Sequence, residues 1–219
     1  MAVLHKKQTL LMPGAKRGRW RSNRGTESSD RDFGMVRPKV LARDGGKCVF
    51  CGLKIDKMHV HHVNDNHEVN DMPNLVTVDE LCHAVNHVGL TGKTAVMIYM
   101  PGVTQVDVNH LCRTIAVAIS FGGETGEKAQ KLSDMIIAKF SPPVAQSFGS
   151  SSPADFGNAL IAMSDDGYVN RHIPLRDVKV FFRPECMGDF VARSRKAMYE
   201  NLPTDQWGRL HDDFMGSED

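Results

Sequence analysis

Three cysteines and an aspartate in the first half of the sequence have the residue types and spacing of metal ligands. Cys48 and Cys51 form a CxxC motif, and Asp79 and Cys82 follow later with the same internal spacing. Zinc prefers four nitrogen, sulfur or oxygen ligands in a tetrahedron, and a CxxC turn supplies two of them. Asp79 is the least typical member, and Glu80 or a nearby histidine is an alternative fourth ligand. The pattern predicts a structural zinc site; the alternative is a set of buried thiols without metal.

Histidines close to these cysteines could carry hydrolytic chemistry. His61 and His62 lie between the two pairs, His83 follows Cys82 directly, and Asn74 opens a short apolar run. Imidazole titrates near neutral pH and can deprotonate water, and a metal held by two imidazoles can act as a Lewis acid on a phosphodiester. Because side chains alternate along a strand, His61 and His62 should face opposite sides. Only one of them can then meet His83, unless the strand twists or bulges.

Four sequence elements occur in the order typical of the HNH endonuclease family, also called the ββα-metal finger. They are RDGGKCVFCG, VHHVNDN, NLVT and CH, and the region around them, about 36–90, resembles the zinc-knuckle form of that family. The resemblance implies that His61 and His83 are ligands of a catalytic divalent metal, Mg²⁺ or Mn²⁺. It also implies that His62 is the general base and that Asn74 holds the hairpin loop and orients this base. Asp79 departs from the pattern, which has cysteine there.

Two later segments resemble a second family, IcmJ/DotN, whose members are small cytosolic proteins of type IVB secretion and related conjugation systems. The segments are VMIYMPGVTQVDVNHLCRTIAVAI at 96–119 and SSSPADFGNALIAMSDD at 150–166, and the similar region spans about 33–190. This resemblance implies a cytoplasmic subunit, peripheral to the inner-membrane secretion complex. Its implied partners are the coupling ATPase and other coupling-complex subunits.

The elements that must position these residues follow from hydrophobic periodicity and turn signals. We expect an α+β fold in which an HNH-like ββα zinc module joins a mainly helical C-terminal half with a few short strands. The expected divisions are a basic flexible arm at 1–32, the zinc module at 33–92, an α+β helical region at 93–204 and an acidic tail at 205–219.

Local patterns predict each element in turn. Within the zinc module they predict a helix at 33–43, a hairpin inside 47–63, a strand at 74–78 and a helix at 79–89. The helical region should contain strands at 94–100 and 177–184, helices at 104–121, 124–140, 153–163 and 192–202, and a loop at 141–153. Thr104 is expected to cap the first of these helices.

The charge balance limits the function classes. The sequence has 219 residues, with 27 Lys and Arg against 26 Asp and Glu, so a strongly basic nucleic-acid coat is excluded. A local basic patch remains open, because the arm at 1–32 concentrates Lys and Arg; it is either a solvated tail or a phosphate-contacting arm. No apolar run approaches the roughly 20 residues of a membrane span, and the N-terminus is a poor signal peptide. These features predict a cytoplasmic protein without a transmembrane segment.

Two functions follow from these observations. The first is a zinc-stabilised scaffold subunit of a type IVB secretion or conjugation coupling complex, docked on the coupling ATPase. The second is a metal-dependent HNH endonuclease that hydrolyses DNA, with His61, His62, Asn74 and His83 as its site. The two are compatible, since a conjugation system handles DNA.

Overall fold

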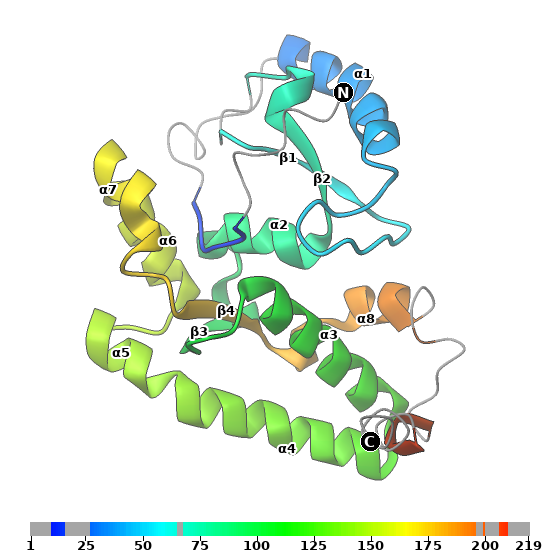
Figure 1. Cartoon of the computed structure of the whole chain (residues 1–219), viewed down its shortest axis with the longest axis vertical. Coiled ribbons are helices and arrows are strands. Elements are labelled where there is room, and N and C mark those ends of the chain that lie inside the picture. Colours follow the sequence, from blue (N-terminus) through cyan, green and yellow to red (C-terminus); the bar gives the residue numbers. More distant parts are fainter. Residues whose placement is uncertain (1–9, 16–26, 65–67, 196–198, 200–205, 210–219) are drawn as a thin grey trace, which may run out of the picture.

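A computed structural model describes residues 10–15, 27–64, 68–195, 199 and 206–209 of the chain (Figure 1). The described residues form the predicted α+β fold, with helices more extensive than strands and two small antiparallel sheets. An N-terminal part built on one sheet lies against a C-terminal part built on the other (Figure 1). One main hydrophobic core runs through both parts.

The N-terminal part places a strand, a second strand and a helix in sequence. After α1 (Glu27–Arg43), β1 (His59–His62) pairs antiparallel with β2 (Leu75–Val78), and α2 (Glu80–Asn86) follows directly. All four residues of β2 are buried, and Leu75 packs with Val40 of α1 in a small second core. The β2 strand is therefore packed on both faces. Because α2 begins two residues after β2 ends, this packing fixes the start of α2.

Polar contacts also fasten α1 to this hairpin. The Arg43 guanidinium donates to the carbonyl oxygens of Met72 and Leu75, both at 2.7 Å. The Asp44 carboxylate accepts from Arg43 Nε at 2.8 Å and from the Thr77 backbone N–H at 2.9 Å. Burial raises the pKa of Asp44, but the bonds from Arg43 and Thr77 together lower it below its ordinary value. The end of α1 is thus fixed where the chain turns into Cys48.

Helices surround the sheet of the C-terminal part. β3 (Ala95–Tyr99) pairs antiparallel with β4 (Val178–Phe182), and α3 (Gln105–Phe121) packs on β4, with α4 (Gly123–Phe140) beside α3 (Figure 1). The other α-helices are α5 (Pro142–Phe148), α6 (Pro153–Ala162), α7 (Asp165–Val169) and α8 (Gly188–Ser194). Short 3₁₀ helices are η1 (Met72–Asn74), η2 (Val88–Leu90), η3 (Gly92–Thr94), η4 (Asn170–His172) and η5 (Pro184–Cys186).

The start of α3 is fixed by a buried amide. Gln105 Nε2 donates to the Val180 carbonyl at 2.9 Å, and Gln105 Oε1 accepts from the Val180 N–H at 2.8 Å. Thr104 caps the helix as predicted, in a capping box with Asp107. These bonds fix the first turn of α3 on β4.

Three secondary-structure predictions were wrong in their extent or type. The helix at 33–43 begins at Glu27 and continues through Pro38, and contacts of Phe33, Arg37 and Arg43 hold it along its length. The predicted hairpin inside 47–63 contains only β1, whose partner is β2, because the CxxC segment is a turn. The predicted loop at 141–153 contains α5, since prolines in a first helical turn lose no hydrogen bond.

The C-terminal helix and part of the predicted arm differ from expectation. The helix predicted at 192–202 is α8, which begins at Gly188; residues 196–198 and 200–202 lie outside the described part. Within the predicted arm, residues 10–15 pack against the protein, and Gly14 exchanges backbone hydrogen bonds with Val85 and Val88. Leu11 and Ala15 are buried, which gives this segment a place in the core. The rest of the arm before Glu27, and the tail apart from 206–209, lie outside the described residues.

A backbone contact joins α6 to the segment after α2. Gly157 of α6 lies against Gly89 of η2, so closely that a Cβ added at Gly157 would stand 2.3 Å from Gly89 Cα. The glycine in the PADFG motif is therefore a packing residue between the two parts. None of the described helices is both long and apolar enough to cross a membrane.

Candidate metal centre

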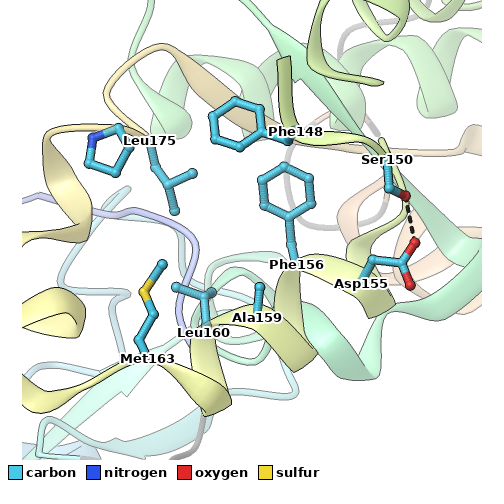
Figure 2. A pocket seen from close by; sticks show the side chains of 9 residues that line it. Phe148, Ser150, Asp155, Phe156, Ala159, Leu160, Met163 and Leu175 are labelled. Carbon is cyan, nitrogen blue, oxygen red and sulfur yellow. Dashed lines mark hydrogen bonds between the residues drawn. The ribbon is translucent and has the colours of Figure 1, made fainter. Parts of the chain in front are cut away.

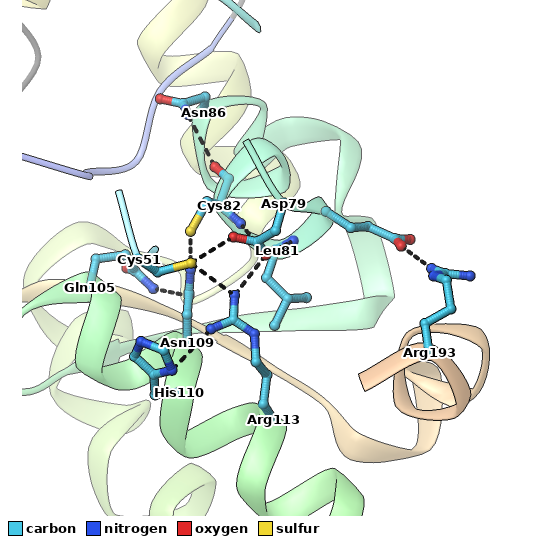
Figure 3. A network of polar contacts seen from close by, with 11 residues as sticks. Cys51, Asp79, Leu81, Cys82, Asn86, Gln105, Asn109, His110, Arg113 and Arg193 are labelled. Carbon is cyan, nitrogen blue, oxygen red and sulfur yellow. Dashed lines mark hydrogen bonds and ion pairs between the residues drawn. The ribbon is translucent and has the colours of Figure 1, made fainter. Parts of the chain in front are cut away.

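The structure brings together the four ligands predicted for zinc, which we call the thiol cluster. The three Sγ atoms and one Asp79 oxygen lie within 4.8 Å of one another, from Cys48, Cys51, Asp79 and Cys82. Cys48 is 2% exposed and both Asp79 and Cys82 are 0% exposed, whereas Cys51 is half-buried. Figure 3 shows Cys51, Asp79 and Cys82 converging beside α3.

Local backbone geometry forms the CxxC turn. Gly46 and Gly52 flank it with φ values of 66° and 72°, which glycine adopts without strain. The Cys48 N–H donates to the Leu53 carbonyl at 2.8 Å, and the Val49 N–H donates to the Thr77 carbonyl at 2.9 Å. The second bond ties the turn to β2, the strand that leads into Asp79.

The two oxygens of Asp79 have different partners. Oδ1 caps α2 by accepting from the Leu81 N–H at 2.9 Å, and it also accepts from Arg113 at 2.7 Å. Oδ2 lies 3.0 Å from Cys51 Sγ and faces the thiols. Glu80, the alternative fourth ligand, instead pairs with Arg193 of α8. The geometry therefore favours Asp79 over Glu80 as the oxygen donor.

The ionisable groups of the thiol cluster shift one another's pKa values. Hydrogen bonds from the Cys51 and Cys82 thiols lower the pKa of Cys48 to about 4, while the same sharing raises the pKa of Cys82. Burial disfavours the charged form of Arg113, yet Asp79 and the neighbouring thiols hold its pKa above the ordinary value. Sulfur ligands with one carboxylate, buried and close together, suit Zn²⁺ in a closed structural site.

A second group of donors comes from β1, α2 and the residue after α2, and we call it the imidazole group. It consists of His61, His83 and His87. Each contributes one ring nitrogen, and these three nitrogens lie within 4.8 Å of one another. The His83 and His87 rings meet edge to face, with centroids 4.8 Å apart. His59 stacks on His83 at 5.1 Å. Three imidazoles around one point can hold a divalent transition metal with a position left for water.

His62 lies apart from the imidazole group, as the strand alternation predicted. Its ring stacks on Phe33 of α1 with centroids 5.4 Å apart, and its Nε2 lies 2.9 Å from Asn70 Oδ1. Asn74 spans the connection between the strands: it accepts from the Asn64 N–H at 3.1 Å and donates to the Val69 carbonyl at 2.8 Å. The structure thus joins His61 with His83, while His62 and Asn74 order the connecting loop.

Three residues near these sites were missed by sequence reasoning. His87 stands four residues after His83, and this helical spacing was the signal that could have found it. Arg113 and Asn109 approach the thiol cluster from α3. They carried no signal, because their partners lie far away in the sequence.

A small apolar pocket opens on the C-terminal part, and its lining contains no member of either donor group (Figure 2). Its volume is about 150 Å³. The lining comes from the end of α5, one face of α6 and the segment before β4, namely Phe148, Ser150, Asp155, Phe156, Ala159, Leu160, Met163, Pro174 and Leu175. Ser150 donates to Asp155 at the rim, and Phe148 is 44% exposed. The pocket can accept one apolar side chain but is smaller than typical cofactor sites.

Comparison with known proteins gives one relative of clear similarity. No protein-family model matches the chain. The chain is 31% identical over 155 residues to the type 4 apparatus protein DotN of Legionella pneumophila subsp. pneumophila (strain Philadelphia 1). The match covers 67% of this chain and 71% of that protein.

Proposed function

The chain belongs to the family of the type 4 apparatus protein DotN, and on that premise we propose that it is a zinc-binding accessory subunit of a type IVB secretion or conjugation coupling complex. The family relationship is the observation that carries this proposal. It concerns most of the chain, and it agrees with the resemblance of the segments at 96–119 and 150–166. The subunit is held at the cytoplasmic side of the inner membrane by the coupling ATPase and its other partners.

Within this proposal the thiol cluster holds a structural zinc ion. Cys48, Cys51, Asp79 and Cys82 are the ligands, and the HNH-like module at 33–92 is the part that the metal stabilises. The burial of the cluster and the closure of all four ligand positions by side chains support a structural rather than a catalytic ion. The helical region at 93–204 is then free to serve as the docking part.

We place the docking of the coupling ATPase at the pocket beside α6. A segment of the ATPase inserts one apolar side chain between Phe156 and Leu175, and exposed Phe148 covers it. The apolar lining and the small volume support a side-chain anchor over a soluble cofactor. The Asp155 carboxylate at the rim could pair with a basic residue of the ATPase segment next to that apolar side chain.

A substitution in the pocket tests this docking. Ala159 lines the pocket and is exposed, so Ala159→Glu fills the pocket with a charge without disturbing the core. We expect affinity for the coupling ATPase to fall at least about tenfold, because a hot-spot anchor loses its apolar site. Isothermal titration with the purified ATPase cytoplasmic region is the measurement.

Asn158→Glu is the matched control, because it adds the same charge at the neighbouring exposed position outside the pocket. Its affinity should stay within about twofold of the wild type. Equal losses in both variants would remove the pocket from the docking site. An ATPase that fails to bind the wild-type chain would contradict the accessory-subunit proposal itself.

A second candidate function is a metal-dependent HNH endonuclease, and the imidazole group favours it. His61, His83 and His87 could hold a Mg²⁺, Mn²⁺ or transition-metal ion, which would supply Lewis-acid chemistry at a phosphodiester. His62 is the residue proposed as general base. Its contact with Asn70 orients its ring, and Asn74 keeps the loop that carries Asn70 in place. DNA is the substrate in this candidate function.

Plasmid nicking with added Mg²⁺ or Mn²⁺ tests the second function. Under it, His62→Ala should slow nicking about 100-fold or more, because a general base contributes that much. His83→Ala should abolish metal-dependent nicking, and zinc content should stay unchanged in both variants because neither histidine belongs to the thiol cluster. Intact plasmid with the wild-type protein would contradict nuclease activity and leave the accessory role standing.

A further inference from the structure

Helix α3 of the C-terminal part supplies polar side chains to the thiol cluster of the N-terminal part. Arg113 Nη2 lies 2.7 Å from Asp79 Oδ1 and 3.7 Å from Cys51 Sγ (Figure 3). Asn109 Nδ2 lies 3.4 Å from Cys82 Sγ. Arg113 and Asn109 are 0% exposed, and their spacing of one helical turn puts both on the same face of α3.

We propose that Arg113 and Asn109 are positioning residues of the metal site, and that Arg113 is what permits a carboxylate in its fourth position. This inference rests on the proposed zinc site. A divalent cation with three thiolates and one carboxylate carries a net charge of −2, and Cys48, Asp79 and Cys82 are almost completely buried. Buried net charge is costly unless it is paired. The Arg113 guanidinium is the cation on α3 that offsets part of it.

Arg113 also selects the oxygen that Asp79 presents. Its Nη2 engages Oδ1, the oxygen that already caps α2, and so leaves Oδ2 turned toward Cys51 Sγ. Arg113 is itself held in place, because its guanidinium lies over the Phe190 ring of α8, 5.6 Å from the centroid. Asn109 orients Cys82 in a similar way, by donating to its Sγ. Asn109 is in turn held by Gln105, whose Nε2 donates to Asn109 Oδ1 at 2.9 Å.

The consequence is a metal site shared between the two parts of the protein. The ligands come from the N-terminal part, whereas the groups that orient and neutralise them come from α3. Metal at the thiol cluster therefore holds the N-terminal part against α3. Loss of the metal should weaken the contacts of Arg113 and Asn109, and loss of those contacts should weaken metal binding. Outer-shell partners of metal ligands typically change metal affinity 10- to 100-fold when they are replaced.

The test is the rate at which zinc passes from the full-length protein to a coloured chelator. Arg113→Met keeps the length of the side chain and removes the charge, and we expect it to release zinc about 10- to 100-fold faster than the wild type. Asn109→Leu should also release zinc faster than the wild type. Arg113→Lys should lie between Arg113→Met and the wild type, because lysine keeps the charge but lacks the planar fork.

Arg193→Met is the matched control. Arg193 pairs with Glu80, the neighbour of Asp79, but it belongs to α8 and its partner is outside the thiol cluster. Its zinc release should stay within about twofold of the wild type. Cobalt substitution gives a second readout, since the thiolate-to-cobalt absorption of the Arg113 and Asn109 variants should shift while that of Arg193→Met should not.

Three results separate the possibilities. Zinc release within twofold of wild type in both Arg113→Met and Asn109→Leu would overturn the inference and leave the zinc site intact. A merely structural Arg113 would lower the Tm of metal-loaded and metal-free protein equally and leave the cobalt spectrum unchanged, which also overturns it. A wild-type protein that binds no zinc would contradict the proposed site itself. If Arg113→Met does not fold, Arg113→Lys and Asn109→Leu decide the question.

Discussion

Purified wild-type protein should contain one zinc ion per chain, and Cys82→Ser should remove it. Cys82 belongs to the first turn of α2 and is 0% exposed, so a serine there can neither replace the thiolate nor reach water. The other three ligands would then surround an incomplete site. Elemental analysis of protein dialysed against a metal-free buffer is the measurement.

The stability cost of this change should be large. A site filled at about a thousand times its dissociation constant contributes about 4 kcal/mol to the free energy of unfolding. That is a large share of the roughly 5–15 kcal/mol that holds a typical domain together. For a chain of this size, the midpoint of thermal unfolding should fall by about 8–16 °C. Chelator treatment of the wild type should give a similar shift, because it empties the same site.

Cys112→Ala separates metal loss from the loss of any buried thiol. Cys112 is also 0% exposed, but it lies outside the thiol cluster, and burial raises the pKa of its thiol to about 12. This variant should keep its zinc. Wild-type protein without zinc, or a Cys82→Ser, His83→Ala double variant that still carries one ion per chain, would overturn the assignment of the thiol cluster, because His83→Ala breaks up the imidazole group.

The thiol cluster could be predicted because its pattern is local. Two ligands sit on one turn and two on the start of one helix, so bringing the pairs together needs only the hairpin between them. Thr104 at the start of α3 was predictable for the same reason, since a capping box occupies four neighbouring residues. Where the interacting residues are close together in the sequence, their types and spacing are enough to predict the local structure.

Residues that depend on distant partners escaped prediction. Arg113 reads as an ordinary helix residue, and only the packing of α3 against the N-terminal part places its guanidinium on Asp79. Segment 10–15 reads as part of a charged arm, yet Gly14 exchanges backbone hydrogen bonds with Val85 of α2 and Val88 of η2. The prolines that open α5 suggested a loop, although proline fits a first helical turn. In each case tertiary contacts determine what local propensity leaves open.

Gly157→Ala should be among the most destabilising single substitutions outside the metal site. The added Cβ would stand 2.3 Å from Gly89 Cα and 2.8 Å from Gly89 N, and both are backbone atoms that cannot swing aside. Moving α6 away from η2 would disturb the junction between the two parts of the core. We expect the free energy of unfolding to fall by about 2 kcal/mol or more, as for overpacked cores.

Helix propensity and packing predict opposite effects of Gly157→Ala on stability. Replacing glycine by alanine in an unobstructed helix stabilises it by about 1 kcal/mol, so helix propensity alone predicts the opposite result. Asn158→Ala, at the adjacent exposed position of α6, should be neutral or slightly stabilising. Gly89→Ala should cost less than Gly157→Ala, because its Cβ would lie 3.1 Å from the nearest atom. Urea unfolding that shows Gly157→Ala to be as stable as the wild type would mean that α6 and η2 do not pack through these glycines.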